Sequence, residues 1–313
     1  MSVAFVFPGQ GSQSVGMLSE LAAHFPQVTT CFNEASDVLG YDLWQIITDG
    51  PAETLNQTDK TQPAMLAAGV AVWRCYKALS DITPAFLAGH SLGEYTALVV
   101  ANVLSFSEAI KLVELRGQLM QAAVPAGQGA MAAILGLDDA QVIAICEKAA
   151  QGQIVEAVNF NSPGQVVIAG ETDAIQRAIA FAKEEGAKRA LQLPVSVPSH
   201  CQLMRPAADK LAERLENIDL FEPDIPVVHN VSVTTSRQPQ AIKTLLAQQL
   251  YHPVRWVETV QWLRSQGVDT LIECGPGKVL TGLVKRIDKS CTAMAMYDPS
   301  SLEKVKQVLE EQV

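Results

Sequence analysis

The chain has 313 residues, of which 48% are hydrophobic, and a formal net charge of −10. This length is enough to bury a large core, and no apolar run approaches the roughly 20 residues that span a bilayer, so we expect a globular protein without a membrane segment. Acidic and basic residues are mixed along the sequence, and no basic stretch of the kind that binds nucleic acid is present.

The N-terminal residues and the cysteines indicate a compartment. No basic region, long apolar stretch or cleavage site precedes the first strand-like segment, which predicts a cytoplasmic protein. The six cysteines are widely scattered, without a Cys-x-x-Cys pair or a histidine at zinc-ligand spacing. We therefore expect reduced thiols and no metal site.

Short apolar segments alternate with longer segments of helical periodicity. Strands are expected at residues 4–7, 85–88 and 270–273, each followed by a helix. This alternation is typical of an α/β architecture with a mainly parallel sheet.

The first of these strands leads into the loop Phe7-Pro8-Gly9-Gln10-Gly11-Ser12-Gln13. Nucleotide-binding loops occur at this position, but Ser14 stands where a dinucleotide fingerprint needs glycine, and Met17 stands where a Walker motif needs lysine. A turn lined by backbone remains. It can bring an N–H such as that of Gln10 close to an acyl oxygen, and an ordinary strand-to-helix turn is an equal alternative.

The second strand ends in Gly89-His90-Ser91-Leu92-Gly93, which matches the G-x-S-x-G nucleophile elbow. Residues 94–98 have the pattern of a helix, so the serine lies at the strand-to-helix turn that this elbow requires. The pattern predicts Ser91 as a nucleophile and the N–H of Leu92 as a donor to a developing oxyanion. A tight turn without catalytic role is the alternative, and we favour the catalytic interpretation because of the strand and helix on either side.

A positive charge lies on the apolar face of the next helix, expected at residues 106–120. The apolar arc of this helix consists of Ala109, Leu112, Val113, Leu115, Leu119 and Met120. Arg116 falls near the middle of this arc, where an unpaired guanidinium is costly. It must reach the rim, meet an internal acid, or await an anionic ligand. If it faces the site, its planar fork suits a carboxylate.

Residues 124–203 differ from the rest of the chain in the order of their expected strands and helices. Strands are expected at 130–136, 154–158, 165–168 and 189–195, and helices at 139–150 and 172–186. This β-α-β-β-α-β order predicts a small ferredoxin-like subdomain inserted into a larger subdomain formed by residues 1–123 and 204–313.

A serine nucleophile needs a general base, and the sequence offers five histidines. We favour His200, which follows the stiff extended segment 194–199 and precedes a helix from residue 203. No acidic residue stands out between Ser91 and His200 as its orienter, unlike in an α/β-hydrolase. Of the other histidines, His24 is expected to lie at the surface, and His229 and His252 are expected to serve structural roles. The side chain of His90 is expected to point away from Ser91.

Together these segments resemble a known family, the malonyl-CoA:acyl carrier protein transacylases of bacterial fatty acid synthesis, over essentially the whole chain. The motifs that carry the resemblance are the loop at 7–13, Gly89-His90-Ser91-Leu92-Gly93-Glu94-Tyr95, Asn159-Phe160-Asn161-Ser162-Pro163-Gly164-Gln165, Pro198-Ser199-His200, Gln249-Leu250-Tyr251 and Gly275-Pro276-Gly277-Lys278.

The resemblance implies a role for each candidate residue. Ser91 would be the acylated nucleophile and His200 its base, oriented by the backbone carbonyl of Gln249. The N–H groups of Gln10 and Leu92 would form the oxyanion hole. A salt bridge from Arg116 would hold the malonyl carboxylate.

The resemblance also implies a hydrolase-like α/β domain interrupted by the ferredoxin-like subdomain, with the site between them. The reaction would be ping-pong malonyl transfer from malonyl-CoA to acyl carrier protein, without metal or other cofactor, by an enzyme that we expect to be a monomer. The acidic carrier would need a local basic patch, for which Lys188-Arg189 and Lys285-Arg286 are candidates. Three alternatives stay open: a polyketide-synthase acyltransferase, a serine thioesterase or esterase, and a non-catalytic carrier-binding subunit. Ser199 also leaves methylmalonyl conceivable as the acyl group.

Overall fold

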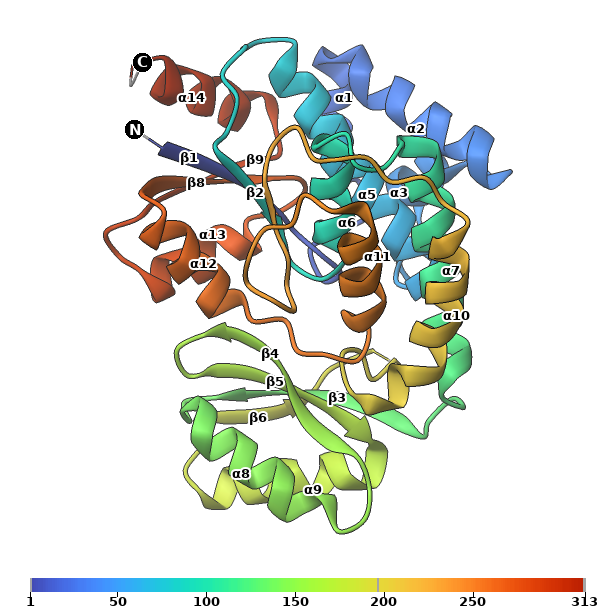
Figure 1. The fold of residues 1–313 in the computed structure, drawn as a ribbon, viewed down its shortest axis with the longest axis vertical. Helices are drawn as coiled ribbons and strands as arrows, with labels where there is room; N and C mark the ends of the chain where they lie inside the picture. The colour runs from blue at the N-terminus through green and yellow to red at the C-terminus, as the bar shows by residue number, and fades with distance from the viewer. Residues whose placement is uncertain (1, 196, 312–313) are drawn as a thin grey trace.

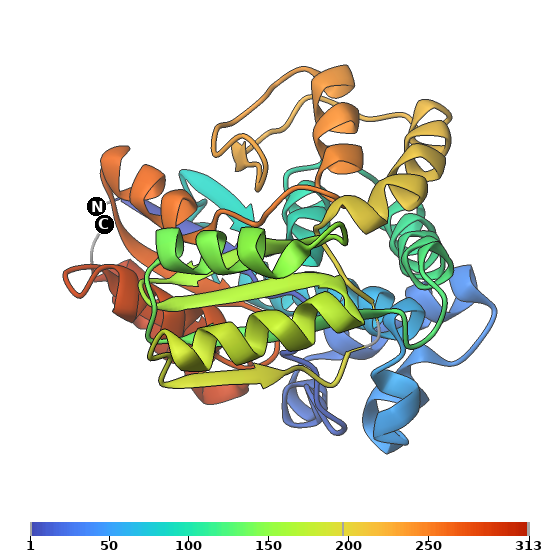
Figure 2. The same ribbon diagram turned by 90° about the horizontal axis from the view of Figure 1, so that it is seen from below.

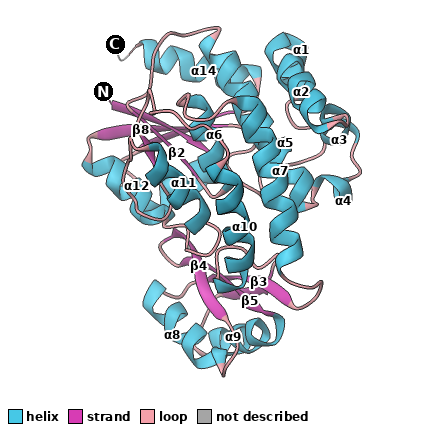
Figure 3. Ribbon diagram, turned by 45° about the vertical axis from the view of Figure 1, so that its right-hand side comes forward, coloured by secondary structure: helices cyan, strands magenta, loops and turns pink. Residues whose placement is uncertain are grey.

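The apolar segments of the chain form two separate β-sheets. In the computed structural model, which describes residues 2–195 and 197–311, the larger sheet lies in the upper half of the view and the smaller sheet below it (Figure 1). Figure 3 shows the two groups of strands with helices packed around each. Ser196, part of the extended segment expected before His200, lies outside the described residues.

The larger sheet has the strand order β7-β2-β1-β8-β9, and every neighbouring pair is parallel. Its strands are β1 (Ser2–Phe7), β2 (Phe86–Gly89), β7 (Val227–Val228), β8 (Val268–Cys274) and β9 (Thr292–Met296). Phe5 and Phe7 of β1 pack into one apolar cluster and Ala4 and Val6 into another, as the alternation of side chains along a strand requires. The sheet is therefore buried on both faces.

Helices cover both faces of this sheet. The helices that precede the small sheet in the chain are α1 (Ser19–His24), α2 (Pro26–Leu39), α3 (Leu43–Asp49), α4 (Ala52–Leu55), α5 (Thr58–Lys77), α6 (Leu92–Val100) and α7 (Phe106–Ala123). Those that follow it are α10 (Arg205–Glu216), α11 (Pro239–Gln248), α12 (Trp256–Ser265), α13 (Val279–Ile287) and α14 (Pro299–Glu310), with a 3₁₀ turn at Gln202–Met204. Among the described residues, no helix has the length and apolarity needed to cross a membrane.

The smaller sheet is antiparallel, with the order β4-β5-β3-β6. Its elements are β3 (Gly129–Leu135), α8 (Asp139–Ala150), β4 (Val155–Ser162), β5 (Gln165–Glu171), α9 (Thr172–Glu184) and β6 (Arg189–Gln192). This is the expected order of elements. Several ends differ from expectation: β4 continues to Ser162 and β5 to Glu171, whereas α9 ends at Glu184 and β6 at Gln192. Figure 2 shows the two helices side by side on one face of this sheet.

The two sheets approach each other at the carboxyl ends of the central parallel strands. Phe7 at the end of β1 is in register with Gly89 at the end of β2, so the loops that follow both strands leave the sheet at the same edge. Asn159 of β4 pairs with Val254, which precedes α12, and links the small sheet to the larger part. The exposed loops at this edge are where a site is expected.

Candidate active site

Ser91 occupies a strained turn between β2 and α6. Its backbone has φ 51° and ψ −107°, whereas the helix begins at Leu92. For a residue other than glycine, this backbone conformation costs of order 1 to 3 kcal/mol. It is maintained only where contacts with the surrounding structure hold it. The turn exposes the hydroxyl at the edge of the sheet, as the nucleophile-elbow pattern predicts.

Two glycines allow the first loop to lie directly against this turn. A Cβ atom on Gly93 would overlap the carbonyl of Phe7, and one on Gly9 would overlap the carbonyl of His90. The position of that second Cβ is only 3.8 Å from the backbone nitrogen of Leu92. The loop that carries Gln10 is thus packed on the start of α6.

His200 is positioned to accept the proton of Ser91. Its Nε2 lies 2.8 Å from Ser91 Oγ, and its Nδ1 lies 2.7 Å from the carbonyl oxygen of Gln249. A carbonyl can only accept, so Nδ1 carries the imidazole proton and Nε2 is the acceptor. A backbone carbonyl therefore takes the place of the acidic residue that a hydrolase triad uses.

Burial keeps this imidazole neutral. His200 is 3% exposed, and the pKa of its imidazole is lowered to about 3, first by desolvation and then by the positive charge of Arg116. A neutral imidazole at ordinary pH is the form that a general base needs.

Two backbone N–H groups point to an oxyanion hole. Gln10 and Leu92 both line the pocket that contains Ser91. Neither N–H has an acceptor among the residues that the structure describes. The N–H of Ser91 itself donates instead to Asn230 Oδ1, at 2.7 Å. Free N–H groups beside a nucleophile are suited to stabilise the oxyanion of acyl transfer.

Arg116 of α7 is buried beside the nucleophile. It is 1% exposed, and its Nη2 donates to Ser91 Oγ at 3.2 Å and to Gln249 Oε1 at 3.0 Å. Its Nη1 donates to Gln62 Oε1 at 2.8 Å, and its Nε has no partner. These acceptors are all neutral, so the internal acid considered from the sequence is not among them. The guanidinium is available to a carboxylate on a bound acyl group.

A cavity of about 300 Å³ surrounds these groups. The turn at Ser91 and Arg116 come from the larger part of the chain, and His200 comes from the loop after β6. The small sheet supplies a wall with both apolar and amide side chains. The residues of this wall are Met131, Ala133, Asn159, Asn161, Gln165 and Val167. Within residues 2–195 and 197–311, no group of histidine, cysteine, aspartate or glutamate side chains is placed to hold a metal.

The six residues expected from the sequence meet at this cavity or directly beneath it, although they come from distant segments: Gln10, Ser91, Leu92, Arg116, His200 and Gln249. Of the other histidines, His24 is exposed, His229 bonds Glu94 Oε1 and His252 lies against the ring of Tyr251; none of the three lines the cavity. His90 bonds Asn161 Oδ1 at 2.8 Å rather than the serine.

Sequence reasoning assigned no role to four residues of the site. Asn161 and Glu94 lie in motifs that carry the family resemblance, so the sequence did mark both positions. Gln62 and Asn230 were not marked, because each acts only through a contact with a residue that is distant in the chain.

A nucleophile turn, a neutral base and free N–H groups together are suited to acyl transfer, and the chain is an acyl transferase: the family model described as an acyl transferase domain matches residues 4–306. The malonyl CoA-acyl carrier protein transacylase of Escherichia coli (strain K12) is 58% identical over 299 residues, which cover 96% of this chain and 97% of that protein. The one of Bacillus subtilis (strain 168) is 47% identical over 311 residues, covering 99% and 98%. This chain belongs to the family of malonyl CoA-acyl carrier protein transacylases.

Solved structures agree with this assignment. An acyl carrier protein S-malonyltransferase from Vibrio cholerae superimposes with a TM-score of 0.95 at 60% identity, covering 97% of this chain and 100% of that one. A malonyl-transacylase in complex with its type II PKS acyl-carrier protein superimposes with a TM-score of 0.97 at 57% identity, covering 98% and 100%.

Proposed function

We propose that this protein transfers a malonyl group from malonyl-CoA to the phosphopantetheine thiol of acyl carrier protein, through a malonyl ester on Ser91, and so supplies malonyl groups for fatty acid synthesis. The names of its relatives support the reaction. The observation that carries the proposal for this chain is the buried guanidinium of Arg116, 3.2 Å from the nucleophilic oxygen. It suits an acyl group that bears a free carboxylate.

In the first half-reaction, His200 Nε2 takes the proton of Ser91 while Oγ attacks the thioester carbon. The N–H groups of Gln10 and Leu92 stabilise the oxyanion that forms. When the intermediate collapses, the carbon–sulfur bond breaks and the imidazolium returns the proton to the sulfur. Free CoA leaves, and malonyl-Ser91 remains.

The second half-reaction uses the same groups in the opposite sense. His200 takes the proton of the carrier thiol, and the thiolate attacks the ester carbon of malonyl-Ser91. The carbon–oxygen bond then breaks, and the proton returns to Ser91 Oγ. Every proton and electron pair is accounted for by these residues and the two substrates, so the proposed chemistry needs no metal or redox cofactor.

Arg116→Ala is expected to remove most of the preference for malonyl-CoA over acetyl-CoA. The salt bridge forms only with an acyl carboxylate, and a charge-assisted bond of this kind contributes about 1.5 to 3 kcal/mol, or roughly 10-fold to 150-fold in the ratio of the two acylation rates. Intact-mass spectrometry after brief mixing with each thioester measures both rates.

Arg177→Ala is the matched control. Its guanidinium also bonds protein acceptors, the carbonyls of Ala149 and Ala150, but it does not line the active-site cavity. It should retain the wild-type preference. A wild-type protein that gains no malonyl mass would contradict the proposed function, whereas an Arg116→Ala variant with unchanged preference would contradict only the carboxylate role.

A second groove, of about 440 Å³, supports a place for the carrier. It brings together Lys188 and Arg286, one from each of the two basic pairs considered from the sequence. Gln165 lines both this groove and the active-site cavity, and it accepts a bond from Arg286 Nη1 at 2.8 Å. Two exposed cations in a groove that shares Gln165 with the active-site cavity suit an acidic carrier with a phosphate on its arm.

The double variant Lys188→Glu/Arg286→Glu should raise the KM for acyl carrier protein about 10-fold or more, because it reverses both charges where the carrier docks. The rate of malonyl-Ser91 formation from malonyl-CoA should stay the same. Steady-state transfer assays and rapid-mixing mass spectrometry measure the two quantities. Lys210→Glu/Lys304→Glu, which reverses two other exposed lysines, should change neither. Equal slowing of both half-reactions would assign the groove to the phosphates of CoA instead.

A polyketide carrier is a second candidate acceptor, because one of the similar structures contains a type II PKS acyl-carrier protein. Offering both kinds of carrier to malonylated protein and comparing the transfer rates decides between them.

We further propose the two-part architecture expected from the sequence, with a hydrolase-like subdomain of residues 1–123 and 204–313 and a ferredoxin-like subdomain of residues 124–203. The element order β3-α8-β4-β5-α9-β6 and the sheet order β4-β5-β3-β6 support the second. Six buried, unpaired cysteines support a reducing location such as the cytoplasm.

A further inference from the structure

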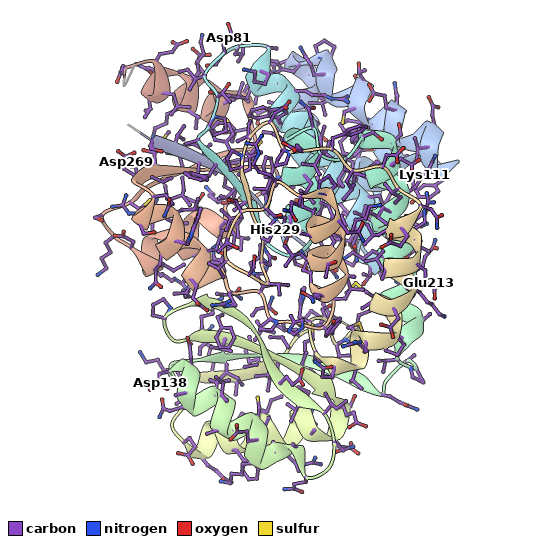
Figure 4. The ribbon with its side chains drawn as sticks, in the orientation of Figure 1. Asp81, Lys111, Asp138, Glu213, His229 and Asp269 are labelled. Atoms are coloured by element: carbon purple, nitrogen blue, oxygen red, sulfur yellow. The ribbon has the colours of Figure 1, made fainter. Side chains whose placement is uncertain are left out.

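Four polar side chains lie buried behind the nucleophile turn, where they reach neither solvent nor the cavity. Glu94 is 1% exposed, and His229, Asn230 and Gln249 are 0% exposed. Figure 4 labels His229 in the interior of the larger part, close to α11. Polar groups are costly to bury, so a connected set at this place calls for a role.

Asn230 closes the turn from behind. Its Oδ1 accepts the N–H of Ser91 at 2.7 Å, and its Nδ2 donates to the carbonyl of Gly89 at 2.6 Å. The carboxamide of Asn230 therefore links Gly89, the last residue of β2, to Ser91, whose backbone is strained. This contact also withdraws the Ser91 N–H from the cavity.

Glu94, in the first turn of α6, holds Asn230 in place. Its Oε2 accepts the backbone N–H of Asn230 at 3.1 Å, and its Oε1 accepts His229 Nδ1 at 2.8 Å. The same carboxylate accepts Gln249 Nε2 at 2.7 Å. Both oxygens act as acceptors, and three donors converge on them.

Gln249 extends the network to the rest of the site. Its Nε2 also donates to the carbonyl of Ser91 at 3.1 Å, and its Oε1 accepts Arg116 Nη2 at 3.0 Å. Its backbone carbonyl is the group that orients His200. Glu94 therefore bonds directly to Asn230, which holds Ser91. It also bonds directly to Gln249, which holds His200 and Arg116.

We propose that Glu94 is a positioning residue for acyl transfer, which sets the nucleophile turn through Asn230 and the carboxylate-binding arginine through the side chain of Gln249. This inference rests on the proposed function. It assigns to Glu94 no contact with substrate. It assigns two separable effects, one on the rate of acylation and one on the choice of acyl group.

Glu94→Gln keeps the shape of the side chain but replaces one acceptor oxygen by an NH₂ group that faces donors. The negative charge that strengthens all three bonds is lost. If the NH₂ group faces Asn230 and Gln249, their bonds are lost as well. If it faces His229, that imidazole must move its proton to Nε2, which has no other partner among the described residues. The rate of malonyl-Ser91 formation should fall about 100-fold, the effect of a misplacement of roughly 1 Å. The preference for malonyl-CoA over acetyl-CoA should fall as well, because the side chain of Gln249, without its charged acceptor, no longer fixes the position of Arg116.

Asn230→Ala separates the two effects. It removes the clamp on Ser91 and leaves the bonds from Gln249 to Glu94 and Arg116. Acylation by malonyl-CoA and by acetyl-CoA should slow by the same factor, so their ratio stays at the wild-type value. In the double variant Glu94→Gln/Asn230→Ala, the loss of rate should be smaller than the product of the two single losses, because both act on the same turn.

Glu273→Gln is the matched control. Glu273 is also 0% exposed and also accepts three bonds, from the N–H groups of Leu280 and Thr281 and the hydroxyl of Thr281, but it does not line the active-site cavity. It should lower the melting temperature without changing the malonyl-to-acetyl ratio of the folded protein. A Glu94→Gln variant that melts lower but keeps the wild-type rate and ratio overturns the inference. Loss of malonylation in the wild type overturns the proposed function instead.

Discussion

Ser91→Ala should gain no detectable malonyl mass when it is mixed with malonyl-CoA, and transfer to acyl carrier protein should fall about 10⁴-fold or more. Among the described residues, Ser91 is the only one whose hydroxyl forms a hydrogen bond with His200 Nε2, at 2.8 Å. Without it the acyl group has no covalent carrier. Intact-mass spectrometry and a carrier-transfer assay measure the two outcomes.

The control for this variant is Ser107→Ala, which removes an exposed hydroxyl in the first turn of α7. It should acylate at the wild-type rate. Equal malonylation of Ser91→Ala and the wild type would show that the acyl group resides elsewhere, and the proposed mechanism would then be wrong.

His200→Ala should slow formation of malonyl-Ser91 by about 10²-fold to 10⁴-fold, the usual contribution of a general base. In the wild type, the lowered pKa of about 3 keeps the imidazole unprotonated far below the ordinary histidine pKa of about 6.5. The acylation rate should therefore show no loss of the base near pH 6.5 and should fall only as the pH approaches the lowered pKa. Single-turnover measurements across pH test this.

Substitution of Arg116 tests the cause of this pH dependence. Its positive charge is the second cause of the lowered His200 pKa, after burial. With acetyl-CoA as the donor, Arg116→Ala should move the acidic fall in rate to higher pH, while burial still holds it below 6.5. His24→Ala, which removes an exposed histidine, should leave rate and profile unchanged. A wild-type rate that halves near pH 6.5 would contradict the buried, neutral base.

The pKa shift also affects stability. Between pH 6.5 and about 3, the unfolded chain binds a proton at His200 that the folded chain does not. Acidification through this interval therefore lowers the free energy of unfolding through this residue, and above pH 6.5 the residue contributes no pH dependence.

Local patterns were sufficient to predict the turn at Ser91, because the strand, the glycines and the start of α6 are contiguous in the chain. They were also sufficient to locate Arg116 on a buried helix face. The lengths of strands were harder. Asn159 and Asn161 made residues after 158 look unlike a strand, since asparagine is disfavoured there, yet both amides face the cavity as part of β4.

The network behind the turn could not be predicted. Asn230 is 139 residues from Ser91, and Gln249 is 155 residues from Glu94. Periodicity reports which face of an element is buried, but not which distant side chain meets it. The same limit applied to the sheet order β7-β2-β1-β8-β9, in which two of the neighbouring pairs, β7 with β2 and β1 with β8, join strands that are far apart in the chain.

The cavity wall offers a route to redesign. In the proposed mechanism Ser91 and Arg116 belong to the parallel sheet and its helices, and His200 belongs to the loop after β6. By contrast, Met131, Ala133 and Val167 reach the cavity from the antiparallel strands β3 and β5. Substitutions on those strands can therefore reshape the space around the acyl chain without touching the turn at Ser91. A library confined to the small sheet would be a natural starting point for accepting bulkier extender units.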